Sequence, residues 1–241
     1  MLRHFCIAIA FSQNAQSRQV AKLIRTPVFR EAFANFDTIA VADANAHRIL
    51  ARYWPVLRPI RFRGKIRSIL GCARGLVKIS AEHGSFARYL RSFAIPRRLY
   101  TAADLDAFWR KFDILQADLR IRGMPFFRST TSLLQLLLDL DYDAVKPDLI
   151  VMRLAHRIGL VPSEKGDLMF RQAARLIQQY AVDRALRPSQ VDLALLAFGG
   201  QTNARLLLRQ VFCPATASCD CTSSREVETA QQRRVCKNPL D

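Results

Sequence analysis

Apolar residues recur at helical spacing along nearly the whole chain. Two such groups are Val20, Leu23 and Ile24, and Phe170, Ala173, Leu176, Ile177 and Tyr180. The strict alternation of apolar and polar residues that is typical of a half-buried strand is missing. Prolines stand between the apolar groups, near the expected helix starts. The pattern predicts an all-α protein of about ten helices.

The N-terminal residues 1–11 are predicted to form the first buried helix. Their apolar run, residues 5–11, is too short for a signal peptide, and no convincing small-residue cleavage site follows it. No apolar stretch approaches the roughly 20 residues that a membrane span needs. We therefore expect a cytoplasmic protein that does not enter a membrane, in which Cys6 and Cys72 are small buried apolar residues.

The charge of the chain indicates a polyanionic partner. The net charge is +17 on 241 residues, and a surplus of this size makes nucleic acid the first candidate. The densest basic run is LRPIRFRGKIR, residues 57–67, in which Arg63 and Lys65 are candidates for contacts with DNA phosphates. A solvated loop and helix start is the alternative interpretation of this run. The mixed composition excludes collagen-like, disordered and coiled-coil classes.

Residues 123–148, GMPFFRSTTSLLQLLLDLDYDAVKPD, predict a tight turn, an apolar helix and a short link that ends in Asp148. A further helix follows from Leu149. The unpaired backbone amides at the start of a helix bind anions such as a DNA phosphate. The candidate residues at that start are Arg128, Ser129, Thr130 and Thr131.

These segments resemble the helix-hairpin-helix DNA glycosylase superfamily, most closely its 3-methyladenine DNA glycosylase I branch. MPFFRSTTSLLQLLL matches the hairpin, and DLIVMRLAHRIG places Asp148 at the catalytic aspartate of the superfamily. IAFSQNAQSRQV is similar to its first helix, and VFREAFANFD, IRFRGKIRSILGCARGL and FARYLRSF to the middle of the branch. The resemblance covers roughly residues 5–165.

The resemblance implies a two-lobed helical fold that binds DNA in a cleft between the lobes. Residues 1–20 and 141–211 would form a terminal lobe, and residues 21–140, with the hairpin at 121–138, an inner lobe. The cysteine-containing residues 212–241 have few large apolar side chains, so we expect a flexible tail there. We expect a monomer.

The implied activity is hydrolysis of the N-glycosidic bond of a modified base after the nucleotide is flipped out of the duplex. Asp148 would stabilise the developing positive charge on the sugar or activate water, although the same residue is an ordinary helix N-cap. Gln13 and Asn14 would fill the gap in the DNA or line the pocket; simple surface positions are the alternative. Thr130 occupies the position of the hairpin lysine in strand-cleaving members, which implies a monofunctional enzyme.

Two aromatic residues are candidates for the base pocket, with a place in the core as the alternative. Phe11 stands where the branch has its base-reading glutamate, and Tyr142 lies beside Asp143 in a polar link. Phe126 and Arg128 replace the hairpin glycines of the superfamily. These departures keep open a second interpretation, a DNA-binding protein without catalysis on the same scaffold. A helical protein-interaction domain is a third.

Four late cysteines stand where many superfamily members bind an iron–sulfur cluster. They are Cys213, Cys219, Cys221 and Cys236. Four thiolates bind such a cluster or a zinc ion, but their intervals of 5, 1 and 14 residues are not the compact family pattern. A tail without metal is favoured, and no cofactor is expected in the chemistry.

Overall fold

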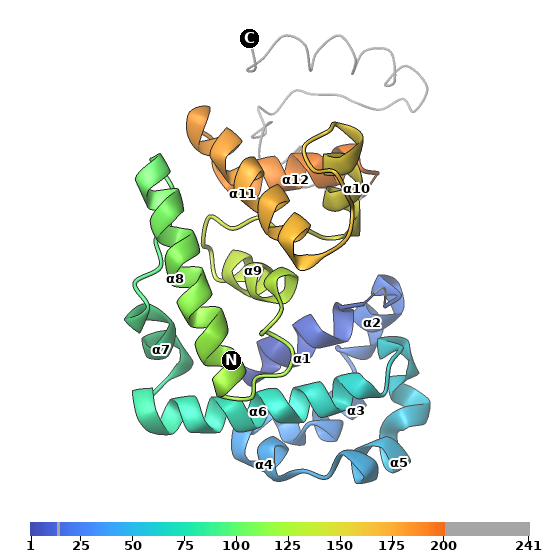
Figure 1. Cartoon of the computed structure of the whole chain (residues 1–241). Coiled ribbons are helices and arrows are strands. Elements are labelled where there is room, and N and C mark those ends of the chain that lie inside the picture. The colour runs from blue at the N-terminus through green and yellow to red at the C-terminus, as the bar shows by residue number, and fades with distance from the viewer. Residues whose placement is uncertain (14, 201–241) are drawn as a thin grey trace, which may run out of the picture.

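Helices make up all the regular structure in residues 1–13 and 15–200, the part of the chain that the computed structural model describes (Figure 1). This confirms the all-α prediction, with twelve α-helices and two short 3-10 segments among these residues. In chain order they are α1 (Leu2–Phe11), α2 (Ser17–Leu23), α3 (Pro27–Ala32), η1 (Ala34–Phe36), α4 (Thr38–Asp43), α5 (Ala46–Leu57), η2 (Arg58–Ile60), α6 (Gly64–His83), α7 (Phe86–Ser92), α8 (Ala102–Ile121), α9 (Thr130–Asp139), α10 (Leu149–Arg157), α11 (Asp167–Asp183) and α12 (Pro188–Phe198). None of the helices in this part of the chain is long and apolar enough to cross a membrane.

Local sequence signals set many of the helix starts. Thr101 caps α8 in a capping box with Asp104, because each side chain bonds to the other residue's backbone N–H. Pro27 and Pro188 open α3 and α12, where a missing N–H costs nothing. Pro55 differs from the expected pattern, because it lies inside α5 near its C-terminal end.

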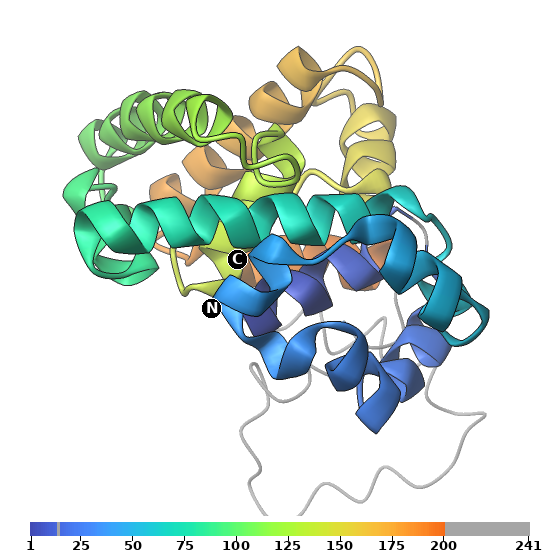
Figure 2. The same ribbon diagram turned by 90° about the horizontal axis from the view of Figure 1, so that it is seen from below.

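The largest core forms around α6. Helices α1 and α4 pack along it, and Figure 2 shows α6 crossing the molecule above the N-terminal helices. Helix α1 contributes Phe5, Cys6 and Ile9, which are fully buried; Ile9 follows Phe5 by four residues and Cys6 by three, so all three lie on one face. This packing confirms that the N-terminal segment is a buried helix.

A second, smaller core lies between α10 and α11 and contains Met152, Ala155, Val161 and Ala173. Helix α1 does not contribute to this core. It belongs to the larger core, which also includes Val151 of α10 and Ala174 and Ile177 of α11.

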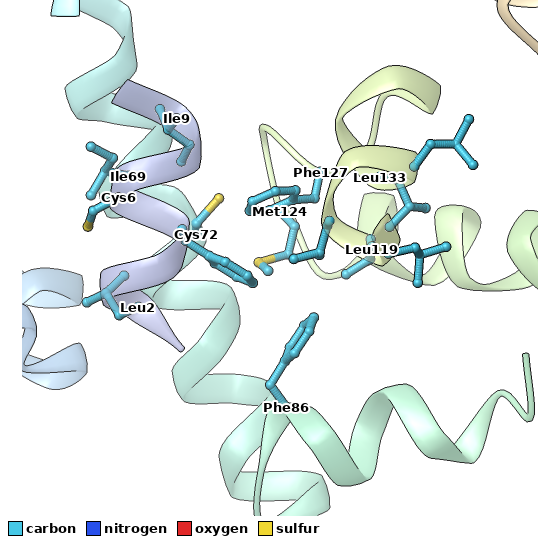
Figure 3. Close-up of a cluster of buried hydrophobic side chains, with 14 of the residues drawn as sticks. Leu2, Cys6, Ile9, Ile69, Cys72, Phe86, Leu119, Met124, Phe127 and Leu133 are labelled. Atoms are coloured by element: carbon cyan, nitrogen blue, oxygen red, sulfur yellow. The ribbon is translucent and has the colours of Figure 1, made fainter. Parts of the chain in front are cut away.

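The turn between α8 and α9 packs directly on α6, and two glycines of α6 make room for it. A methyl group built on Gly75 would lie 2.2 Å from Met124 Sδ, and one on Gly71 2.7 Å from Pro125 Cγ. Figure 3 shows Met124 and Phe127 of this turn among the side chains of α1, α6 and α8. The Phe127 ring centroid is 4.3 Å from that of Phe5. The hairpin turn is therefore positioned by close packing on α6.

A network of charged side chains ties α12 to the connection before α8. Asp143, which lies in the α9–α10 connection and is 3% exposed, accepts hydrogen bonds from Arg187 Nε and Nη2 at 3.1 Å each and from the Leu99 backbone N–H at 3.0 Å. Asp141 is exposed and pairs with both Arg98 and Arg187. These two guanidinium groups hold the pKa of Asp141 at about 2.

Candidate functional site

The hairpin formed by α8 and α9 presents a polar recess on the surface. Arg120 at the end of α8, Arg128 and Ser129 in the turn, and Asp167 at the start of α11 line a shallow depression. Ser129 is the N-cap of α9, and its Oγ accepts a hydrogen bond from the Ser132 backbone N–H at 3.4 Å. The structure thus brings two predicted residues, Arg128 and Ser129, to one surface recess at a helix start. Two arginines and the positive end of α9 favour an anion there.

The two threonines of the hairpin have different places. Thr130 is fully buried, and its Oγ1 accepts a hydrogen bond from Gln116 Nε2 at 3.3 Å. This placement corrects the expectation that Thr130 contacts DNA. Its hydroxyl lies inside the protein, where it is the hydrogen-bond acceptor for the buried Gln116 of α8. Thr131 is half-buried on the first turn of α9.

Lys65 is also inside the protein, contrary to the expected phosphate contact. Its side chain is 3% exposed, and Nζ donates to the backbone oxygens of Ala10 at 3.1 Å and Ser12 at 2.6 Å. Burial, with a smaller contribution from the positive charge of Arg61, lowers the pKa of Lys65 to about 8. Lys65 therefore caps the C-terminal end of α1, where helix carbonyls lack partners.

Arg63, the other predicted residue of the basic run, is exposed, and its Cζ is 5.4 Å from the ring centroid of Trp54. Its guanidinium is free to approach a phosphate from this stacked position. The Lys65 bonds also place the basic run next to the end of α1. Gln13, which follows that end, is exposed at the surface.

Gln13 has a φ of 53°, the left-handed region that residues other than glycine rarely adopt. Such strain is concentrated at functional sites. Phe11, predicted in the base pocket, is half-buried and packs against the larger core. Asn14, predicted beside Gln13, lies outside the described residues.

Asp148 is the N-cap of α10, as its position after Pro147 suggests. Its Oδ1 accepts hydrogen bonds from the backbone N–H groups of Ile150 at 2.9 Å and Val151 at 3.1 Å. The side chain is half-buried. Both cap bonds use the same oxygen, so within residues 1–13 and 15–200 no hydrogen bond occupies Oδ2. Capping and chemistry are therefore compatible in this residue.

A second carboxyl group near Asp148 was not predicted from the sequence. Asp192 of α12 is 3% exposed, and its Oδ1 has no hydrogen-bond partner among the described residues. Burial raises the pKa of Asp192 to about 7; the negative charge of Asp148 adds to this, and a backbone hydrogen bond from Lys146 opposes it. The signal in the sequence was an aspartate within the apolar run VDLALLA.

Tyr142 does not face a cleft. It is 6% exposed, and the guanidinium carbon of Arg97 lies 5.3 Å from its ring centroid. This corrects the prediction of Tyr142 as a base-pocket residue. Its polar neighbours in the sequence, Asp141 and Asp143, both pair with Arg187, whereas Tyr142 is part of the larger core.

A metal site is absent from the described part of the chain, because no three His, Cys, Asp or Glu side chains come together there. Cys6 and Cys72 are buried free thiols, as expected, and burial raises the pKa of both. Cys213, Cys219, Cys221 and Cys236 lie outside the described residues, so the expectation that these four cysteines bind no metal stays a prediction.

The chain matches the model of a known protein family. The model of a family described as methyladenine glycosylase matches residues 9–136, which include the end of α1, the basic run and the hairpin turn. Comparisons with curated proteins and with solved structures found no match. The family match agrees with the branch that the sequence motifs indicated. It ends before Asp148 and α10.

Proposed function

Because the chain belongs to the methyladenine glycosylase family, we propose that it is a DNA glycosylase that hydrolyses the bond between a modified base and its deoxyribose. The observation that carries the proposal is the family match over residues 9–136, which includes the hairpin. The net charge of +17 supports binding to a polyanion.

The hairpin recess is the proposed site for a DNA phosphate. The backbone N–H groups at the start of α9 would bind the phosphate oxygens, and the guanidinium groups of Arg120 and Arg128 would add charge. Asp167 on the rim of the recess repels an anion, and its interaction with Arg171 Nε at 3.5 Å reduces that repulsion. This contact would fix the register of the DNA without reading its sequence.

Base release requires the nucleotide to leave the duplex, because the bond to be broken is inaccessible in the stack. Gln13 is the proposed residue at the gap. It is exposed, held in a strained conformation at the end of α1, and adjacent to the basic run through the Lys65 bonds. The proposal also includes a cleft between the two lobes in which the DNA binds.

Asp148 is the proposed catalytic residue. As the base leaves with the bonding electrons, positive charge develops on the sugar, and the Asp148 carboxylate would stabilise that charge or take a proton from the attacking water. Oδ1 holds the start of α10 through its two cap bonds, which fixes the direction of Oδ2, an oxygen that no residue of the described chain hydrogen-bonds.

The proposed enzyme is monofunctional, because the hairpin helix offers no amine to attack the sugar. Thr130 occupies the position of the family lysine, and its hydroxyl is buried against Gln116. Water is then the nucleophile, and the product is an abasic site in an intact strand.

The experiment that tests this function is a screen of duplex oligonucleotides that each contain one modified base. We expect at least one of them to acquire breaks after treatment with alkali and none before it. Strand breaks without alkali, with protein trapped on the DNA by borohydride, would show that an amine such as Lys146 attacks the sugar. The absence of base release across the screen would favour the second candidate.

The second candidate is a DNA-binding protein without catalysis. It is favoured by the hairpin turn, in which Phe126, half-buried on the larger core, and Arg128, which is exposed, stand in place of the family glycines. Such a protein would bind DNA with the salt dependence of phosphate contacts and leave every base in place.

A further inference from the structure

Phe62 is an exposed aromatic ring in the middle of the basic segment, residues 57–67. It lies between η2 and α6, and its side chain is 43% exposed. Two cations lie near its ring centroid: Arg61 Cζ at 5.0 Å and Lys65 Nζ at 5.9 Å. Arg63 follows it in sequence and stacks on Trp54. Packing in the core does not explain this ring, because much of its surface is accessible to solvent.

The backbone around Phe62 is strained and anchored. Arg61 has a φ of 75°, and Gln13 at the end of α1 has a φ of 53°. Lys65 connects the two places, since its Nζ bonds to the Ser12 oxygen at 2.6 Å and lies 5.9 Å from the Phe62 ring. The η2 turn also contacts α2, and Figure 1 shows both beside the start of α6. The buried side chain of Lys65 therefore keeps Phe62 close to the end of α1, where Gln13 lies.

We propose that Phe62 is a stacking platform for an unpaired base of a DNA strand whose phosphates lie along the basic segment. Aromatic rings in a positively charged groove bind single-stranded nucleic acid in this way, because every base has a face that stacks on a ring. The proposal rests on the proposed function for its ligand, DNA. It involves neither the hairpin recess nor Asp148.

The chemistry of the segment favours a nucleic acid strand as the occupant. Residues 57–67 contain five basic side chains and no acidic one. Lys65 is buried, which leaves Arg58, Arg61, Arg63 and Arg67 as the exposed ones. A strand offers both the anions that these arginines bind and the flat apolar surface that matches the ring. An enzyme that flips a nucleotide also produces an unpaired base next to the gap, near Gln13.

The test compares two 15-nucleotide strands that differ only in their bases: oligothymidine, and a strand of the same length made entirely of abasic tetrahydrofuran sites. Both carry the same phosphates. Phe62→Leu should weaken binding of oligothymidine about 5- to 100-fold, the range for loss of one stacked base, and leave binding of the abasic strand unchanged. Fluorescence anisotropy at fixed salt measures both affinities.

Tyr100→Leu is the matched control. Tyr100 is 77% exposed and lies outside the basic segment, so its loss should change neither affinity. Phe62→Trp is the second variant, and it keeps the ring. It should bind oligothymidine at least as tightly as the wild type, and the added tryptophan emission should be quenched by oligothymidine and not by the abasic strand. If Phe62→Leu loses helix content, the Phe62→Trp variant still tests the stacking platform.

Equal weakening on both strands would overturn the proposal, since Phe62 would then only position the arginines. Unchanged affinity for both strands, or a new tryptophan that neither strand quenches, would overturn it as well. Base release is measured separately. A wild-type protein that releases no base and still needs Phe62 for oligothymidine contradicts the glycosylase function and leaves the platform standing.

Discussion

Replacing Asp143 by alanine should destabilise the protein by about 1–3 kcal/mol, the usual cost of leaving a buried hydrogen-bond donor without its acceptor. The structure supplies the reason. Asp143 is 3% exposed, receives two hydrogen bonds from Arg187, and accepts the Leu99 backbone N–H at 3.0 Å. Alanine would leave the Leu99 N–H without its acceptor inside the protein. It would also remove the buried anion that faces the guanidinium of Arg187.

Asp141→Asn is the matched control for this prediction, because Asp141 pairs with Arg98 and Arg187 from the surface and asparagine tolerates its φ of 64°. Exposed ion pairs contribute little, so we expect a much smaller loss than for Asp143→Ala. Urea unfolding followed by circular dichroism measures the free energy of unfolding of both variants. Equal losses would refute the reasoning, since burial would then not determine the strength of this network.

Two further predictions concern the turn on α6 and the buried carboxyl of α12. Gly75→Ala should lower the free energy of unfolding by about 1–3 kcal/mol through overpacking, because the new methyl group would lie 2.2 Å from the Sδ of the fully buried Met124. Gly64→Ala is the control and should be neutral or slightly stabilising, because nothing lies within 4 Å of the added methyl group. Equal stabilities of the two variants in urea would contradict the overpacking at Gly75. The folded-state pKa of Asp192 is raised from 3.8 to about 7, so its contribution to stability is complete below 3.8 and is lost as the pH rises to about 7. Across this range the free energy of unfolding should fall by about 4 kcal/mol more in the wild type than in Asp192→Asn, and equally steep changes in both would contradict the raised pKa of Asp192.

The sequence predicted the features that local signals determine. Proline followed by aspartate before an apolar helix predicted the cap of α10, and the serine and threonine run predicted the start of α9. The short apolar run of residues 5–11 predicted a buried first helix. In each case the residues that decide the structure are neighbours in the chain.

The features that were mispredicted depend on distant partners. Lys65 looked like a surface cation in a basic run, but its partners, the carbonyls of Ala10 and Ser12, lie more than 50 positions away in the chain. Thr130 is buried because Gln116 of the preceding helix needs an acceptor. No local pattern encodes these contacts, and the effect of the Asp148 charge on Asp192 could not be predicted for the same reason.

The most direct test of the central claim is base release by Asp148→Asn on a substrate that the wild type cleaves. The amide keeps the shape and the cap oxygen, so the fold and DNA affinity should remain near those of the wild type. Base release should fall by orders of magnitude, because the negative charge that faces the developing cation is lost. A folded Asn variant that releases the base at the wild-type rate would contradict the claim that Asp148 is the catalytic residue.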